Sequence, residues 1–258
     1  MDYTSPKYNI QLLPSYTLWI KTDFTTEYLL VSDEDNRILR CISYEKGKPK
    51  SEGLKLLSLP FEKIKLTAPE SSFIIHPLDI FKENDLSLYE EFLPYISSGE
   101  LSLYKSKELN LAMLYAHDAW LISDWKKIFP NLEVIPECTV LLETLQENME
   151  KGFRLYIHEL DKKMTFAVLN DEKILLINSF EVREEEDFHF YLLKILKQLN
   201  VNPYFDTCII TQQKKDLDLA NIASQYAKQV KTIENHLYSE EKDHGFTEIR
   251  NLNFRNQL

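Results

Sequence analysis

Two apolar runs joined by a polar turn make up residues 166–180, which read Phe166-Ala-Val-Leu-Asn-Asp-Glu-Lys-Ile-Leu-Leu-Ile-Asn-Ser-Phe180. Branched and aromatic side chains favour strands, and an Asn-Asp pair favours a tight turn, so this stretch predicts a β-hairpin. A further apolar run covers residues 153–157, directly after Gly152. Together the three runs predict an antiparallel meander of three strands.

The same meander is predicted near the start of the chain, over residues 16–44. The two copies align at an offset of 137 residues, which falls to 136 in the third strand because one residue is lost in the hairpin turn. The aligned segments are Leu18-Trp-Ile20 with Leu155-Tyr-Ile157, Val31 with Val168, Ile38-Leu39 with Ile174-Leu175, and Ser43-Tyr44 with Ser179-Phe180. The chain therefore contains an internal repeat.

After each meander, the predicted elements alternate between helices and strands. A three-stranded antiparallel ribbon followed by crossover helices and parallel strands is the ribonuclease-H-like unit, and two such units in tandem make an actin-like fold. We therefore expect an α/β protein with the actin-like ATPase fold, built from two ribonuclease-H-like lobes with mixed sheets. The first lobe is predicted over residues 1–150 and the second over residues 151–258, including a polar C-terminal tail.

The remaining elements follow from hydrophobic periodicity. Apolar side chains recur at spacings of three and four over residues 183–199, which predicts the clearest helix in the chain. The acidic run 184–187 lies at its start, where the helix dipole favours negative charge. The other predicted elements are helices over residues 85–95, 118–129, 136–151 and 217–230, strands over 109–115, 132–135, 207–211 and 231–234, and a hairpin of 64–66 with 72–75.

Composition narrows the classes of partner. The 258 residues include 41 acidic and 30 basic side chains, for a net charge of −11 and a pI of about 5.1. An acidic surface repels nucleic-acid phosphates and anionic lipid heads, so neither is expected as a partner. The chain starts without a basic segment followed by an apolar one, and no apolar run is long enough to span a membrane. These features predict a cytoplasmic protein.

Glycine is scarce, and this excludes a group of nucleotide-binding motifs. The chain has five glycines, none within five residues of another, whereas a typical share of 7% would give about 18. Motifs such as G-x-G-x-x-G and the P-loop need clustered glycines, because the backbone must approach phosphate closely and often at positive φ. No Gly-rich phosphate loop is therefore present.

The side chains that commonly bind metals are dispersed. Cys41, Cys138 and Cys208 are isolated and flanked by apolar residues, which predicts buried, reduced thiols without a disulfide or a metal. The six histidines form no His-x-x-x-His pair. Successive carboxylates over residues 184–187 point in different directions on a helix and do not converge on one ion. We expect no metal site and no cofactor.

Several segments resemble a known superfamily. The run 166–180, the acidic residues after it and the segments Phe188–Leu199 and Asn202-Pro203 resemble the second half of actin-like proteins related to those of pilus assembly. They resemble more closely an uncharacterised domain-of-unknown-function family with that fold. The first half agrees, through Phe73-Ile-Ile-His-Pro77 and Ile128-Phe-Pro-Asn131. The resemblance covers most of residues 14–235 and consists of apolar patterns more than catalytic signatures.

The resemblance implies where a nucleotide would bind. In actin-like ATPases each half begins with a hairpin of the type D-x-G-[ST], whose turn amides wrap the phosphates while the Asp acts through metal-bound water. The matching residues of the first hairpin are Asp23, Thr25 and Thr26, with Thr25 in place of the glycine. The second hairpin offers Asp161 and again lacks glycine. If a nucleotide binds, these four residues are the ones expected to contact it.

Three functions from different classes remain open. The first is a non-catalytic scaffold, a degenerate ATPase that has lost nucleotide binding and binds a protein partner of unknown identity. The second is an ATP-binding or ATP-hydrolysing member of the superfamily that uses Asp23 and Asp161 on Mg²⁺. The third is a ribonuclease-H-type nuclease, which the acidic balance disfavours. Since fold does not carry activity and the expected site lacks its glycines, the scaffold is the leading hypothesis.

Overall fold

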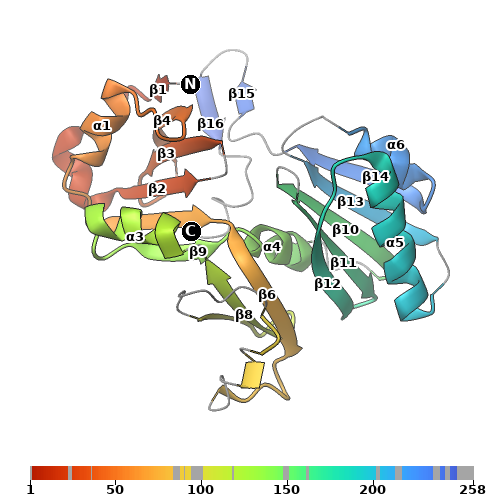
Figure 1. Ribbon diagram of the computed structural model, residues 1–258. Helices are drawn as coiled ribbons and strands as arrows, with labels where there is room; N and C mark the ends of the chain where they lie inside the picture. The colour runs from red at the N-terminus through yellow and green to blue at the C-terminus, as the bar shows by residue number, and fades with distance from the viewer. Residues whose placement is uncertain are drawn as a thin grey trace. The chain divides into compact units, whose positions relative to one another are not determined.

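Two large sheets organise the computed structural model, which describes residues 2–22, 25–35, 37–83, 88–89, 91–93, 101–117, 119–147, 151–160, 163–201, 204–212, 217–234, 239–241 and 245–248 (Figure 1). The chain divides into two compact units. One is formed by residues 1–139 together with 237–258, and the other by residues 140–236. The predicted boundary at residue 150 falls among residues 148–150, which lie outside the described residues.

The first unit is built on a mixed sheet of six strands. A meander of three antiparallel strands occupies its middle, two further strands run parallel to the first strand of the meander, and a short N-terminal strand covers the other edge. In spatial order the strands are β1 (Asp2–Thr4), β4 (Ile38–Glu45), β3 (Thr26–Ser32), β2 (Thr17–Thr22), β5 (Lys63–Ala68) and β9 (Glu133–Pro136).

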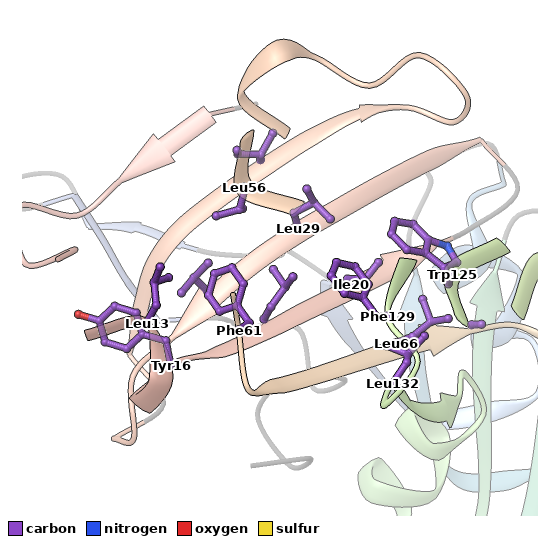
Figure 2. Packing of buried hydrophobic residues seen from close by; sticks show 14 of the residues in the cluster. Leu13, Tyr16, Ile20, Leu29, Leu56, Phe61, Leu66, Trp125, Phe129 and Leu132 are labelled. Carbon is purple, nitrogen blue, oxygen red and sulfur yellow. The ribbon is translucent and has the colours of Figure 1, made fainter. Parts of the chain in front are cut away.

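One face of this sheet carries the main core of the first unit. Strand β2 alternates, so that Leu18 and Ile20 belong to this core while Trp19 packs on the opposite face. The helices that contribute to the core are η1 (Ile10–Ser15), α1 (Ser51–Leu57) and α3 (Ala119–Ile128). Figure 2 shows Trp125 of α3 and Phe129, the residue after this helix, beside Leu66 of β5. The burial of these large side chains is what holds the helices on the sheet.

A smaller three-stranded sheet is inserted between β5 and α3. It consists of β6 (Glu70–Pro77), β8 (Leu111–His117) and β7 (Ser102–Ser106), all antiparallel to their neighbours. The predicted hairpin of residues 64–66 with 72–75 is therefore wrong. Strand β5 pairs in parallel with β2, because this places Leu66 in the core, and β6 pairs with β8 instead. Strand β7 has no counterpart among the predicted elements.

The second unit is built on a mixed sheet of five strands. In spatial order these are β12 (Lys173–Glu181), β11 (Lys163–Asn170), β10 (Phe153–Leu160), β13 (Phe205–Gln212) and β14 (Ala227–Glu234). Helices α5 (Glu185–Leu199) and α6 (Leu219–Ser224) lie on one face of it (Figure 1), where Phe188 and Ile222 share a core with the strands. Helix α4 (Thr139–Glu147) precedes β10, and its Leu141, Leu142 and Leu145 are buried.

The two large sheets have the same topology, which confirms the repeat. Each sheet has a meander of three antiparallel strands, and two further strands lie parallel to the first strand of that meander. Strands β2, β3, β4, β5 and β9 of the first unit correspond in this order to β10, β11, β12, β13 and β14 of the second. Even an irregularity is shared, because both third strands contain one extra residue. Leu39 is skipped in the pairing of β4 with β3, and Leu175 in the pairing of β12 with β11. This is the same β-bulge in both units.

The predicted helix over residues 217–230 is wrong in its second half. Helix α6 begins after Asp218, whose carboxylate accepts a hydrogen bond from the Asn221 N–H, and it ends at Ser224. Strand β14 then runs parallel to β13, with Val230 opposite Cys208. The branched side chains of β14 suit this pairing better than a continued helix.

The remaining described strands, β15 (Ser239–Glu241) and β16 (Gly245–Glu248), pair with each other, and β16 lies against β4. Among the described residues no helix is both long and apolar enough to cross a membrane.

Two phenylalanines of α5 provide a test of this packing. Phe188 is completely buried and Phe190 is 61% exposed. We expect Phe188→Ala to lower the free energy of unfolding by about 3–5 kcal/mol, because it opens a cavity in the core. Phe190→Ala is the matched control on the same helix and should leave stability almost unchanged. Urea unfolding followed by circular dichroism measures both, and equal losses in the two variants would contradict the assignment of the buried face.

Candidate functional site

The first hairpin joins β2 and β3, and it is the place where the resemblance puts phosphate contacts. Asp23 and Phe24 lie outside the described residues. Thr25 accepts a hydrogen bond at its carbonyl from the Lys46 N–H at 2.9 Å, and its Oγ1 lies 3.3 Å from that of Thr26. Thr26 is already part of β3, where it pairs with Glu45. The two threonines are thus held to each other and to the end of β4.

The second hairpin joins β10 and β11 and is tighter. Leu160 pairs with Lys163, and the two residues between them, Asp161 and Lys162, lie outside the described residues. Residues 158–165 contain no glycine. The second hairpin therefore offers none of the glycine backbone that a close phosphate contact favours.

A buried ion pair lies at the end of β2 in the first unit. Lys21 Nζ is 3.0 Å from Glu137 Oε1, and each side chain is only 2% exposed. Three adjacent strands bring the two residues together, because Lys21 of β2 pairs with Thr67 of β5, and β5 pairs with β9 directly before Glu137. Removing two charges from water is costly, and a close, hydrogen-bonded partner offsets that cost.

The chain after β9 is fixed by further buried hydrogen bonds. The Glu137 N–H donates to the Ala68 carbonyl at 3.0 Å, and the Cys138 N–H donates to Glu70 Oε2 at 3.1 Å. Thr139 Oγ1 donates to the Pro136 carbonyl at 2.6 Å. These bonds hold the start of α4, so the Glu137 carboxylate meets Lys21 in a defined geometry.

The corresponding position of the second unit is also polar and buried. His158 aligns with Lys21 in the repeat, and it pairs with Thr211 as Lys21 pairs with Thr67. His158 Nδ1 lies 2.8 Å from Thr211 Oγ1, which also donates to the Ile157 carbonyl at 3.3 Å. Both units therefore keep a buried nitrogen group near the end of the central strand, and each group has a polar neighbour within the chain.

In the described part of the structure, no group of three or more His, Cys, Asp or Glu side chains is arranged to hold a metal ion. The acidic run lies at the start of α5 as predicted, with Asp187 Oδ2 accepting from the Arg183 N–H at 3.0 Å. His117 Nδ1 lies 3.3 Å from the Pro69 carbonyl, and burial lowers the pKa of this imidazole. Its sequence neighbour Asp118 lies outside the described residues.

The three cysteines are all buried thiols, and their predicted burial is confirmed. Burial raises the pKa of Cys41 and of Cys208 to about 12, because a thiolate would lose its hydration in these surroundings. Cys138 Sγ lies 3.0 Å from Met113 Sδ, inside the first unit. None of these positions resembles a reactive thiol, which needs partial exposure and a nearby positive charge.

Lys21 and Glu137 were missed by the sequence analysis, although one signal was present. Leu18-Trp-Ile20 is a wholly apolar run, and Lys21 continues it before the turn begins. A charge that extends a buried strand requires a partner. The partner itself could not be found locally, because Glu137 is 116 residues away in the sequence.

Comparisons with known proteins identify the fold. A family model described as "Protein of unknown function (DUF3822)" matches residues 7–230. A Bacteroides thetaiotaomicron protein with actin-like ATPase fold and unknown function is similar in structure, with a TM-score of 0.71, 20% identity, and coverage of 87% of this chain and 93% of that one.

The PilM–PilN type IV pilus biogenesis complex also contains a similar chain, with a TM-score of 0.52, 10% identity, and coverage of 83% and 87%. No curated protein matches the sequence. The fold is therefore the actin-like ATPase fold that the repeat predicted.

The buried ion pair can be tested by removing one charge or both. Lys21→Met leaves the Glu137 carboxylate buried without its counter-charge, and we expect a loss of about 3–5 kcal/mol in the free energy of unfolding. Lys21→Met with Glu137→Leu removes both charges and should be much closer to wild type.

Lys55 and Glu52 provide the control for this experiment, because they form an exposed pair at 2.9 Å on α1. Lys55→Met should cost less than about 1 kcal/mol. Urea titration compares the variants, and a loss for Lys21→Met as small as that of the control would show that water reaches the Lys21–Glu137 pair.

The thiols give a second test, which needs no mutation. Because Cys41 and Cys208 are buried and have a raised pKa, we expect them to react with a colorimetric disulfide reagent far more slowly in the native protein than in denaturant. All three thiols should titrate in denaturant without reductant. Rapid native reaction would contradict the burial, and a count of one would reveal a disulfide.

Proposed function

Because the chain belongs to the DUF3822 family and has the actin-like ATPase fold, we propose that it is a non-catalytic scaffold that has lost nucleotide binding and binds another protein. The observation that carries the proposal is the buried Lys21–Glu137 pair at the first hairpin. The proposal treats the expected nucleotide site as a place that the chain fills with its own side chains.

The charge of Lys21 supports the loss of phosphate binding. A lysine near a phosphate site acts as a point charge for the ligand. Here the ammonium is already neutralised by Glu137 at 3.0 Å, and both side chains are out of reach of water. A phosphate that entered would have to replace that carboxylate and leave it buried without a partner, which is strongly unfavourable.

The backbone of the two hairpins also supports the loss of nucleotide binding. Phosphate oxygens are bound by amides at about 3 Å, an approach that glycine permits and a β-branched residue hinders. Thr25 stands at the glycine position of the first hairpin, and its carbonyl is engaged by Lys46. The glycines nearest to the two meanders, Gly47 and Gly152, lie after β4 and before β10, not in the hairpins.

A protein partner is the remaining part of the proposal. One chain of similar fold belongs to the PilM–PilN type IV pilus biogenesis complex, so the fold is compatible with a role in protein assembly. The net charge of −11 disfavours nucleic acid as the alternative. The proposal does not name the partner protein. The cytoplasmic location remains a prediction.

Thermal unfolding with millimolar Mg·ATP tests the loss of nucleotide binding. A ligand well above its Kd stabilises the native state by more than about 1.4 kcal/mol, which raises the Tm of a chain of this size by several degrees. We expect no such rise, and Mg²⁺ alone and ATP with chelator serve as controls. A rise that requires both Mg²⁺ and ATP, and that Asp23→Asn removes, would overturn the proposal in favour of an ATP-binding protein.

A further inference from the structure

The two units differ in how they cover one equivalent sheet edge. In the first unit the outer edge of β4 is covered by β1, which pairs antiparallel with Tyr3 opposite Cys41. In the second unit the aligned strand is β12, at the edge of the five-stranded sheet. No strand within the described residues pairs with its outer side. An open edge presents unpaired N–H and C=O groups to any further strand.

The composition of β12 makes this edge suited to pairing. Its nine residues contain no proline, glycine or internal charge, and Ile174 to Ile177 form an unbroken apolar run of half-buried side chains. The opposite edge of the same sheet is different, because β14 carries exposed Lys228 and Lys231, and edge lysines discourage strand addition. Of the two edges, β12 is the one that has neither internal lysines nor a pairing strand among the residues that the structure describes.

The charges of β12 are arranged for pairing with a copy of itself. Lys173 is its first residue and Glu181 its last, and both are exposed. When two such strands pair antiparallel around Ile177, Lys173 of each copy comes to Glu181 of the other, Ile174 comes to Phe180, and the two Ile177 side chains meet at the centre. Opposite charges and apolar side chains across a strand pair are both stabilising.

We propose that two copies of this chain associate through their β12 strands, antiparallel and around a two-fold axis at Ile177, so that two five-stranded sheets become one continuous sheet. Such an interface is self-complementary, as a two-fold dimer requires. The proposal does not depend on the proposed function, because it rests on the pairing edge of β12 and not on whether the chain binds a nucleotide.

The first unit shows that this topology accepts a strand at that place. Cys41, which pairs with the centre of β1, aligns with Ile177 in the repeat. The shared bulge does not stop pairing on the outer side, since the Ser5 N–H donates to the Leu39 carbonyl at 2.8 Å, directly at the bulged residue. One strand pair alone buries less area than a standard interface, so a weak, concentration-dependent dimer is expected.

Sedimentation equilibrium over a range of concentrations tests the proposal with charge reversal. Lys173→Glu places like charges together at both ends of the interface, and we expect it to raise the dimer Kd about tenfold. Lys173→Glu with Glu181→Lys restores opposite charges and should return the Kd towards wild type. That recovery is the result that a merely local effect of either substitution would not produce.

Two controls keep the result interpretable. Glu181 has a partner in its own chain, because its Oε1 lies 2.6 Å from Arg183 Nη2, so circular dichroism and Tm must show that each variant is folded. Leu54→Lys changes an exposed apolar residue of the first unit and should leave the Kd unchanged.

Two results would overturn the proposal. One is a wild-type chain that stays monomeric at high concentration, which would leave the β12 edge to an extended segment of another protein. The other is a dimer that ignores the charge reversals, because its interface would then lie elsewhere.

Discussion

Each large sheet depends on a central strand that is buried on both faces. Leu18, Trp19 and Ile20 of β2 are completely buried, and so are Leu155 and Ile157 of β10. Such a strand lies between an antiparallel neighbour on one side and a parallel neighbour on the other, so its middle residues are paired on both sides and their side chains are buried. Any polar side chain there must find its partner inside the protein, since water does not reach it.

That constraint explains the polar ends of the two central strands. Lys21 meets Glu137, and the aligned His158 meets Thr211. The position has the same role in both sheets, but the groups that satisfy it differ in charge and come from different elements. A duplicated fold thus keeps its geometry while the chemistry at equivalent points diverges, which is why the fold by itself says little about activity.

The two units also diverge at their edges and in what is inserted between shared elements. The first unit has an additional three-stranded sheet between β5 and α3, and its β4 edge is covered by β1. Between β13 and β14 the described part of the second unit contains the short helix α6, and its β12 edge carries no described strand. What the two units share is the buried framework, and what distinguishes them lies at its periphery, where interactions with other molecules are made.

The sequence by itself determined the two meanders, the repeat, helix α5 and the absence of glycine from the hairpins. These features depend on neighbours a few residues apart, through the two-residue period of strands and the 3.6-residue period of helices. Only the tertiary structure decided that β5 pairs with β2 and not β6, that residues 227–230 belong to a strand and not to a helix, and that Glu137 neutralises Lys21. The reason is that distant segments compete to bury the same apolar face and the same charge, and a local pattern records the need for a partner but not which segment supplies it.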